Sequence, residues 1–370
     1  MREAITILVQ VSKVNLPEDT AKVLHDQEIR WTLIDSVGNR CAVSDLIGSA
    51  CDESNVLNVS ERLESAGFVV NWRCSSERSL DESGELVDVD GLTNFGKSTY
   101  DWPSEPTVLA VVPYWRCERW LPRCLHSLVN QTRLLTNIVV IDDGSEILPT
   151  EIVKAFPEVT LLSSRHSPQV GPYRLVQSVV EQVDYTAFLF QDADDWSSCD
   201  RLQTLLKTAR LHCAEVVGSQ EVRVLEPEKT LQAVGYPMNV NIAMRRAPGH
   251  GLLHPTSLVT RNILKRVGGF ATGLRFGADS EFLLRAHWVA RIVNSAEFCY
   301  FRRKRPESLT TAEETGLESP ARQLLTKKIK QKAIERKHVI SRGYEPDLQP
   351  LSTAPSVSLE PICGPALRWR

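Results

Sequence analysis

The sequence predicts an α/β protein whose central region forms a Rossmann-like, mostly parallel sheet with helices on both faces. Apolar runs of the length that is typical of buried strands occupy residues 108–112, 138–141, 159–162 and 188–190. Segments with apolar side chains at helical spacing separate these runs. Strands that alternate with helices favour a parallel sheet that is covered on both sides. The last run ends abruptly in the acids Asp192, Asp194 and Asp195.

Composition narrows the class of protein. The chain has 370 residues, enough for two domains, and 42% of them are hydrophobic. A net charge of −3 gives no electrostatic case for a nucleic-acid partner. No apolar run approaches the roughly 18–20 residues that a membrane-spanning helix needs, and the first residues lack the apolar core of a secretory signal. Nine cysteines without a Cys-x-x-Cys pair argue against a disulfide framework or a zinc site. We therefore expect a soluble, cytoplasmic protein.

Changes in composition along the chain predict five segments. Residues 81–106 are acidic and rich in Gly, Ser and Pro, which is typical of a linker. The linker separates a small accessory domain from the α/β domain. A basic helix and a Pro/Ser tail, which we expect to be disordered, follow. The remaining boundaries are residues 1–80, 107–318, 319–343 and 344–370.

Each strand of the central region is followed by a distinct segment. The first strand leads into a turn at Pro113 and Tyr114 and then a helix, with Pro122 in its first turn, where a missing N–H does little harm. The third strand precedes Gly171 and a second helix. The fourth precedes a helix whose apolar residues are Leu202, Leu205, Leu206 and Ala209.

Acids follow two of these strands. Asp142 and Asp143 follow the second strand, and Asp192, Asp194 and Asp195 follow the fourth. Parallel strands end at the same edge of a sheet, which is where ligands bind in open α/β sheets. Clustered carboxylates repel each other unless a cation or a proton offsets them, and Mg²⁺ and Mn²⁺ prefer oxygen ligands and substrate phosphates. The pattern predicts a metal–diphosphate site. The alternative is an acidic turn, in which Asp143 forms the turn and Asp195 caps the next helix.

These stretches resemble the family 2 glycosyltransferases with the GT-A fold over roughly residues 107–312. The resemblance depends on the order and spacing of several motifs, none of which would suffice alone. They are VVPYW at 111–115, SLVNQT at 127–132, VIDDGS at 140–145, QDADD at 191–195, HPTS at 254–257, VGGF at 267–270 and GADSEFLLR at 277–285.

The resemblance implies roles in binding a nucleotide-sugar donor, with a UDP-sugar expected. It implies Mn²⁺ or Mg²⁺ as the cofactor, acting as a Lewis acid on the departing diphosphate. The residues concerned are Pro113 and Tyr114 at the base, Asp142 or Asp143 at the uracil or ribose, Gly171 and Arg174 near the nucleotide, Asp192 at the ribose or metal, and Asp194 at the metal.

The resemblance also implies an inverting reaction in which Asp279 is the general base. Glu281 is the second candidate. Both acids also fit the first turn of a helix, where the helix dipole favours negative charge. Family members often have Glu-Asp where this chain has Ala278 and Asp279. The chain therefore keeps the base but lacks the neighbouring Glu, and the contact that this Glu would make with the acceptor is in doubt.

The segment that closes over the diphosphate often carries a His where this chain has Lys304 or Arg305. A cation there could bind phosphate directly, or be a solvated basic strand end. His254 and Trp196 are candidates for the acceptor site, although an aromatic residue after a strand more often packs in the core. His250 and His254 have a metal-binding spacing, but Gly and Pro nearby favour a loop.

The acceptor is expected to be a glycan, a peptide or a small molecule that offers a hydroxyl or thiol. Residues 1–80 fit a small winged-helix shape and loosely resemble the peptide-binding domains of ribosomal-peptide maturation, a role that a leader-peptide pull-down tests. We expect the basic helix at 320–340 either to lie on an anionic membrane or to pack on the catalytic domain.

Two further functions are alternatives to a glycosyltransferase. The first is a nucleotidyltransferase, which would need a Gly-rich phosphate loop. The second is an inactive binding module, against which Asp194 and Asp279 argue.

Overall fold

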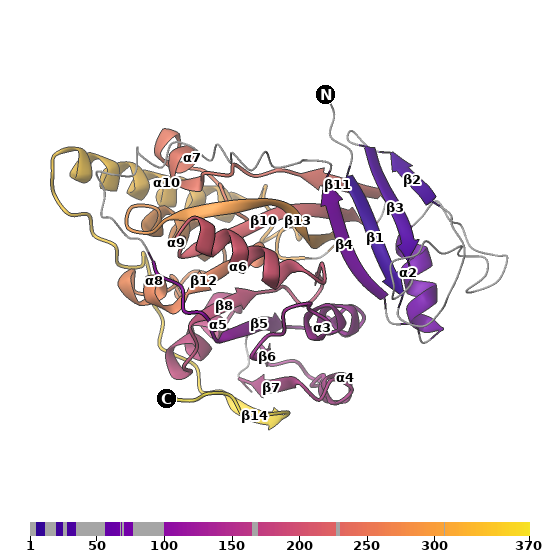
Figure 1. The fold of residues 1–370 in the computed structure, drawn as a ribbon. Coiled ribbons are helices and arrows are strands. Elements are labelled where there is room, and N and C mark those ends of the chain that lie inside the picture. Colours follow the sequence, from indigo (N-terminus) through magenta and orange to yellow (C-terminus); the bar gives the residue numbers. More distant parts are fainter. Residues whose placement is uncertain are drawn as a thin grey trace.

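The computed structural model describes two sheets that pack into one body (Figure 1). The described residues are 5–11, 20–24, 28–34, 56–66, 68, 70–76, 100–164, 169–226, 230–306 and 308–370.

The first half of the large sheet has the predicted parallel arrangement. Four parallel strands lie in the order β7-β6-β5-β8, with the strand that begins the domain in the interior of the sheet. The prediction of a Rossmann-like sheet is confirmed. These strands are β5 (Val108–Tyr114), β6 (Asn137–Asp142), β7 (Val159–Ser163) and β8 (Ala187–Phe190).

The second half of the sheet is mixed. β12 runs antiparallel between β8 and β10, so β10 points the same way as β8, and β13 pairs with β10 in parallel. A short strand, β9, pairs with β13 immediately after the acidic segment. The strands are β9 (Trp196–Ser197), β10 (Val216–Leu225), β11 (Thr230–Val234), β12 (Leu258–Thr260) and β13 (Ile292–Lys304).

Helices cover both faces of this sheet. Successive side chains of a strand point to opposite faces, and β5 divides in this way: Leu109 packs with α5, α8 and α9, whereas Ala110 packs with α3 and α6. The helices are α3 (Leu121–Val129), α4 (Thr150–Lys154), α5 (Pro172–Gln182), α6 (Arg201–Leu211), α7 (Val240–Arg246), η2 (His254–Thr256), α8 (Arg261–Arg266), α9 (Ala278–Ala286) and α10 (Pro320–Ser341).

The N-terminal region forms a four-stranded mixed sheet in the order β2-β3-β1-β4 with one described helix. β1 is parallel to β3, a pairing that the expected winged-helix shape did not anticipate. Residues 35–55 of the region with the expected winged-helix shape lie outside the described residues. Peptide binding by this region stays a prediction. The elements are β1 (Ile5–Val11), β2 (Thr20–Leu24), β3 (Glu28–Ile34), α2 (Val56–Ser65) and β4 (Val70–Ser76).

Aromatic packing joins the small sheet to the large one. Trp72 on β4 lies 5.1 Å from the ring of Trp196 and 5.0 Å from that of Phe301. Beside these rings, Arg123 of α3 makes an ion pair of 2.8 Å with Glu64 of α2. The N-terminal unit thus packs directly behind the segment that carries the acids.

The prediction that residues 344–370 form a disordered tail is wrong. This segment lies along the α/β domain and includes β14 (Glu360–Cys363), which pairs with the edge strand β7 (Figure 1). Val357 and Leu367 are buried, and the Pro365 carbonyl accepts a hydrogen bond of 2.6 Å from Thr160. The free edge of β7 supplies backbone hydrogen-bond partners for this segment. The low hydrophobicity of residues 344–370 gave no indication of this pairing.

The predicted linker lies only partly within the described residues. Residues 100–106 pack on the domain, where Trp102 is buried and its indole donates to the Ala214 carbonyl at 2.8 Å. The predicted basic helix is α10, which turns Ile329, Ala333 and Ile340 inward and most of its lysines outward. In the described part of the chain, no helix is long and apolar enough to span a membrane.

Candidate functional site

The acids predicted from strand ends lie at one edge of the large sheet. Asp142 ends β6, and Asp192 lies two residues beyond the end of β8. β5 lies between these strands and is parallel to both. The carboxyl ends of all three strands therefore meet at the same edge, as the sequence predicted.

Asp142 and Asp143 both bind backbone amides. The buried Asp142 carboxylate accepts hydrogen bonds from the N–H groups of Gly144 and Ser145 and from the Ser163 hydroxyl, each at about 3.1 Å. Asp143 accepts from the N–H groups of Val170 and Gly171 at 2.9 Å. These bonds fix two turns, so the turn-forming alternative describes part of their role. Contact with a donor stays a prediction.

The residues predicted to surround the nucleotide differ in exposure. Tyr114 is 1% exposed and packs in the core, and its contact with a nucleotide base stays a prediction. Pro113 is half-buried, and the neighbouring Trp115 is 41% exposed. Gly171 has the positive φ of 88° that glycine favours and immediately precedes α5. Arg174 donates to the Pro355 carbonyl at 2.8 Å.

Asp195 is held by β13. One carboxylate oxygen accepts from the Tyr300 hydroxyl at 2.9 Å and the other from the Arg303 N–H at 2.7 Å. The predicted role as a helix N-cap is wrong, because α6 begins later, after Asp200. Asp195 instead fixes the acidic segment to the sheet.

Asp192 is half-buried, and its carboxyl has an altered acidity. Burial, followed by the negative charge of Asp194, raises the pKa of Asp192 to about 7, and the charge of Asp279 adds to this. The positive charge of Arg302 acts in the opposite direction. Asp192, Asp194 and Asp279 therefore share one electrostatic environment, although Asp279 is 87 positions beyond Asp192 in the sequence.

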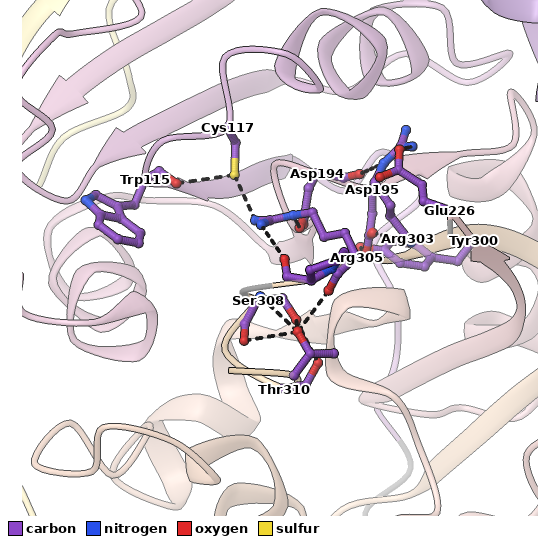
Figure 2. A network of polar contacts seen from close by, with 12 residues as sticks. Trp115, Cys117, Asp194, Asp195, Glu226, Tyr300, Arg303, Arg305, Ser308 and Thr310 are labelled. Atoms are coloured by element: carbon purple, nitrogen blue, oxygen red, sulfur yellow. Dashed lines mark hydrogen bonds and ion pairs between the residues drawn. The ribbon is translucent and has the colours of Figure 1, made fainter. Parts of the chain in front are cut away.

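Asp194 forms an ion pair with Arg305. Nε of Arg305 lies 2.8 Å from Oδ2 of Asp194. Figure 2 shows the two side chains beside each other. The Arg305 guanidinium also lies 4.3 Å from the centre of the Trp120 ring. Lys304, the other predicted cation, is half-buried; burial, and then the charge of Arg302, lowers its pKa to about 8.

A divalent metal ion would find few protein ligands at this edge. The described residues contain no group of three or more His, Cys, Asp or Glu side chains that could hold a metal. Both carboxylate oxygens of Asp195 accept hydrogen bonds, and one carboxylate oxygen of Asp194 accepts a hydrogen bond from Arg305. The residues fit Mg²⁺ or Mn²⁺ if the ion contacts Asp192 or the second oxygen of Asp194 and takes its other ligands from a diphosphate and water.

Asp279 lies in the first turn of α9, which follows Gly277 with φ 77°. Its carboxylate accepts no hydrogen bond from the described residues, and it is half-buried. Its charge acts on Tyr173, His254 and Arg322. Its role as the general base stays a prediction.

Glu281 lies on the same helix but is only 1% exposed. Its carboxylate forms a two-point ion pair with Arg285, at 2.8 and 2.6 Å, and accepts from the Leu351 N–H at 3.2 Å. A carboxylate with these partners connects α9 to the C-terminal segment. Glu281 thus differs from Asp279 in having its carboxylate engaged by other residues.

The two residues predicted at the acceptor site are buried. His254 stacks on Phe190 at 4.3 Å, and burial lowers the pKa of its imidazole to about 4, which keeps it neutral at physiological pH. Trp196 is fully buried and stacks on Phe301 at 5.3 Å. The prediction that Trp196 contacts an acceptor is therefore wrong, and its role is packing.

The structure adds Tyr173, Arg302 and Arg322 to the site. Arg302 lies 3.7 Å from the buried Glu221, and Arg322 stacks on Phe276 at 4.5 Å. The charge of Arg302 acts on Asp192, and the charge of Asp279 acts on Arg322. The charges of both acids act on Tyr173. The run of basic residues at 302–305 was the sequence feature that could have identified Arg302 as a site residue. Tyr173 and Arg322 lie outside the motifs.

Comparison with protein families identifies the central region. Residues 109–266 match the family described as Glycosyl transferase family 2. This region is a family 2 glycosyl transferase domain. The matched residues include the acids at both strand ends, whereas Asp279 and Arg305 lie beyond them. The glycosyl transferase domain thus contains one part of the candidate site, and the following segment contains the rest.

Two curated relatives have similar sequences. Glycosyltransferase GlyA of Streptococcus pneumoniae is 31% identical over 103 residues, which is 27% of this chain and 14% of that protein. Uncharacterized glycosyltransferase EpsJ of Bacillus subtilis is 24% identical over 223 residues, which is 55% of this chain and 63% of that protein. The chain therefore spans less than two thirds of either relative.

Among solved structures, those of S. aureus TarS are similar to part of this chain. The structure of TarS 1-349 in complex with UDP-GlcNAc is 19% identical, covers 64% of this chain and 74% of that chain, and has a TM-score of 0.47. The same fragment in complex with UDP has a TM-score of 0.45.

Proposed function

We propose that this protein is an inverting glycosyltransferase that moves a sugar from a nucleotide-sugar donor, a UDP-sugar, to an acceptor hydroxyl or thiol. The observation that carries the proposal is the open carboxylate of Asp279, which shares an electrostatic environment with Asp192 at the edge of a family 2 glycosyl transferase domain. A base on one side and a charged diphosphate region on the other are what a single displacement requires.

In the proposed reaction, Asp279 accepts the proton of the acceptor hydroxyl or thiol. The acceptor atom attacks the anomeric carbon as the bond between that carbon and the diphosphate oxygen breaks. The electron pair leaves with the nucleoside diphosphate, and the anomeric configuration inverts. Preorganised charges that meet the developing negative charge lower the barrier.

In the proposed reaction, cations of β13 and of the segment after it meet the leaving group. Arg302 and Lys304 are half-buried near Asp192 and Asp195, and Arg305 lies on Asp194. Fixed Arg and Lys donors bind phosphate oxygens strongly. Mn²⁺ or Mg²⁺, held by Asp192 or Asp194, would supply further Lewis-acid stabilisation of the diphosphate.

A donor screen tests this proposal. We expect the purified protein with Mn²⁺ to release a nucleoside diphosphate from one sugar nucleotide in a panel, with UDP-sugars ahead of GDP- and dTDP-sugars. Release of pyrophosphate from a nucleoside triphosphate and a sugar phosphate would instead indicate a nucleotidyltransferase. Binding of a sugar nucleotide without turnover, across a range of acceptors, would indicate an inactive binding module.

We also propose that α10 contacts an anionic membrane surface. Lys327, Lys328 and Lys330 are exposed, as are Leu324 (71%) and Ile334 (41%), and an apolar and basic surface of this kind suits the membrane interface. We expect flotation with vesicles that contain phosphatidylglycerol, and loss of binding at high salt or with all three lysines replaced by glutamine. Equal recovery with neutral vesicles would contradict the proposal.

A further inference from the structure

The Asp194–Arg305 ion pair is more enclosed than the surface pairs of this chain. The two side chains are 18% and 17% exposed, and their charged atoms are 2.8 Å apart. Arg116 and Glu146 make a pair of nearly the same length, 2.9 Å, but are 55% and 85% exposed. Water and salt screen a surface pair strongly and an enclosed one much less.

Two further contacts hold the Arg305 guanidinium in place. It lies over the Trp120 ring at 4.3 Å. Its Nη2 is 3.7 Å from the buried sulfur of Cys117, a contact that can be followed in Figure 2. A guanidinium is planar and weakly hydrated, so stacking on an aromatic face suits it better than it would suit a lysine. The side chain is therefore positioned on Asp194 by contacts on more than one side.

The neighbouring basic residues have other acidic partners. Arg303 pairs with Glu226 and donates its Nε to the Asp194 carbonyl, and Arg302 is nearest to Glu221. Among the described residues of this basic segment, Arg305 is the one whose guanidinium forms an ion pair with the Asp194 carboxylate.

A metal ion and Arg305 would need the same carboxylate. A divalent cation binds carboxylate oxygens directly, whereas the guanidinium uses Oδ2 of Asp194 as a hydrogen-bond acceptor and places a positive charge beside it. Two cations on one carboxylate repel each other. Occupation of Asp194 by one cation must weaken its attraction for the other.

We propose that Arg305 is an internal competitor for the metal at Asp194 and that it sets the metal affinity of the site. Without a bound nucleotide, Arg305 neutralises Asp194 and keeps metal affinity low. When a diphosphate arrives, its oxygens attract both the metal and the guanidinium, so the two cations no longer depend on one carboxylate. This inference rests on the proposed function for the assignment of Asp194 to the metal.

The test is a Mn²⁺ titration of the full chain without nucleotide, followed by electron paramagnetic resonance. We expect Arg305→Gln to bind Mn²⁺ about tenfold more tightly than wild type, because a competing charge is removed. We expect Arg305→Lys to stay closer to wild type, since it keeps the charge. The double variant Arg305→Gln/Asp194→Asn should lose the gain.

Arg133→Gln is the matched control, because Arg133 makes a 3.0 Å ion pair with Glu105 elsewhere on the surface. It should bind Mn²⁺ as wild type does, and circular dichroism should show that all variants are folded. Equal affinity of wild type and Arg305→Gln, or a gain that survives Asp194→Asn, would overturn the inference. The donor screen with the wild-type protein tests the proposed function separately, because it measures nucleoside diphosphate release and not metal affinity without nucleotide.

Discussion

Replacement of Asp279 by Asn is expected to lower the rate of sugar transfer by about 100- to 10,000-fold, which is the usual contribution of a general base. The amide is nearly the same size but cannot accept the acceptor's proton. Asp279 accepts no hydrogen bond from the described residues, so the change should leave the fold intact. The measurement is the rate of nucleoside diphosphate release at saturating donor, together with donor affinity by calorimetry.

Glu281→Gln is the matched control, because it removes the second acid of the same helix turn. Glu281 pairs with the buried Arg285, so this variant should unfold more easily yet keep transfer within about tenfold of wild type per folded molecule. Full activity of Asp279→Asn, or a larger catalytic loss in Glu281→Gln, would reverse the assignment of the base.

Trp72→Ala is expected to reduce the free energy of unfolding by about 3–5 kcal/mol, as large core truncations do. Trp72 is 2% exposed and packs against Trp196 and Phe301, so its loss leaves a cavity between the two sheets. Because Trp196 lies one residue after the acidic segment, donor binding should also weaken. Urea denaturation followed by circular dichroism measures the stability.

Trp369→Ala provides the comparison for this variant, since Trp369 is 40% exposed and the same residue type is changed. We expect its effect to be at most about 1 kcal/mol. If Trp72→Ala were no less stable than Trp369→Ala, the N-terminal unit would contribute little to the stability of the folded chain.

Features that depend on local sequence were predictable. The apolar runs that became β5 to β8 locate the acids, because a parallel sheet brings the ends of its strands to one edge. The first-turn position of Asp279 in α9 followed from the acids before an apolar run. These arguments needed only periodicity and topology.

Features that depend on distant partners were not predictable. Arg305 reaches Asp194 across 111 positions of sequence because β9 pairs with β13, and nothing in either motif specifies that pairing. The same holds for Trp196, whose burial depends on Trp72, and for β14, which uses the free edge of β7. Residue type suggested their chemistry, but tertiary contacts decided which atoms they meet.

The measurement that tests the central claim most directly is the stereochemistry of transfer, followed by proton NMR at the anomeric position with the donor identified in the screen. The proposed single displacement with Asp279 as base predicts a product of inverted anomeric configuration from its first appearance, formed about 100- to 10,000-fold more slowly by Asp279→Asn. A product that retains the configuration of the donor would contradict the account.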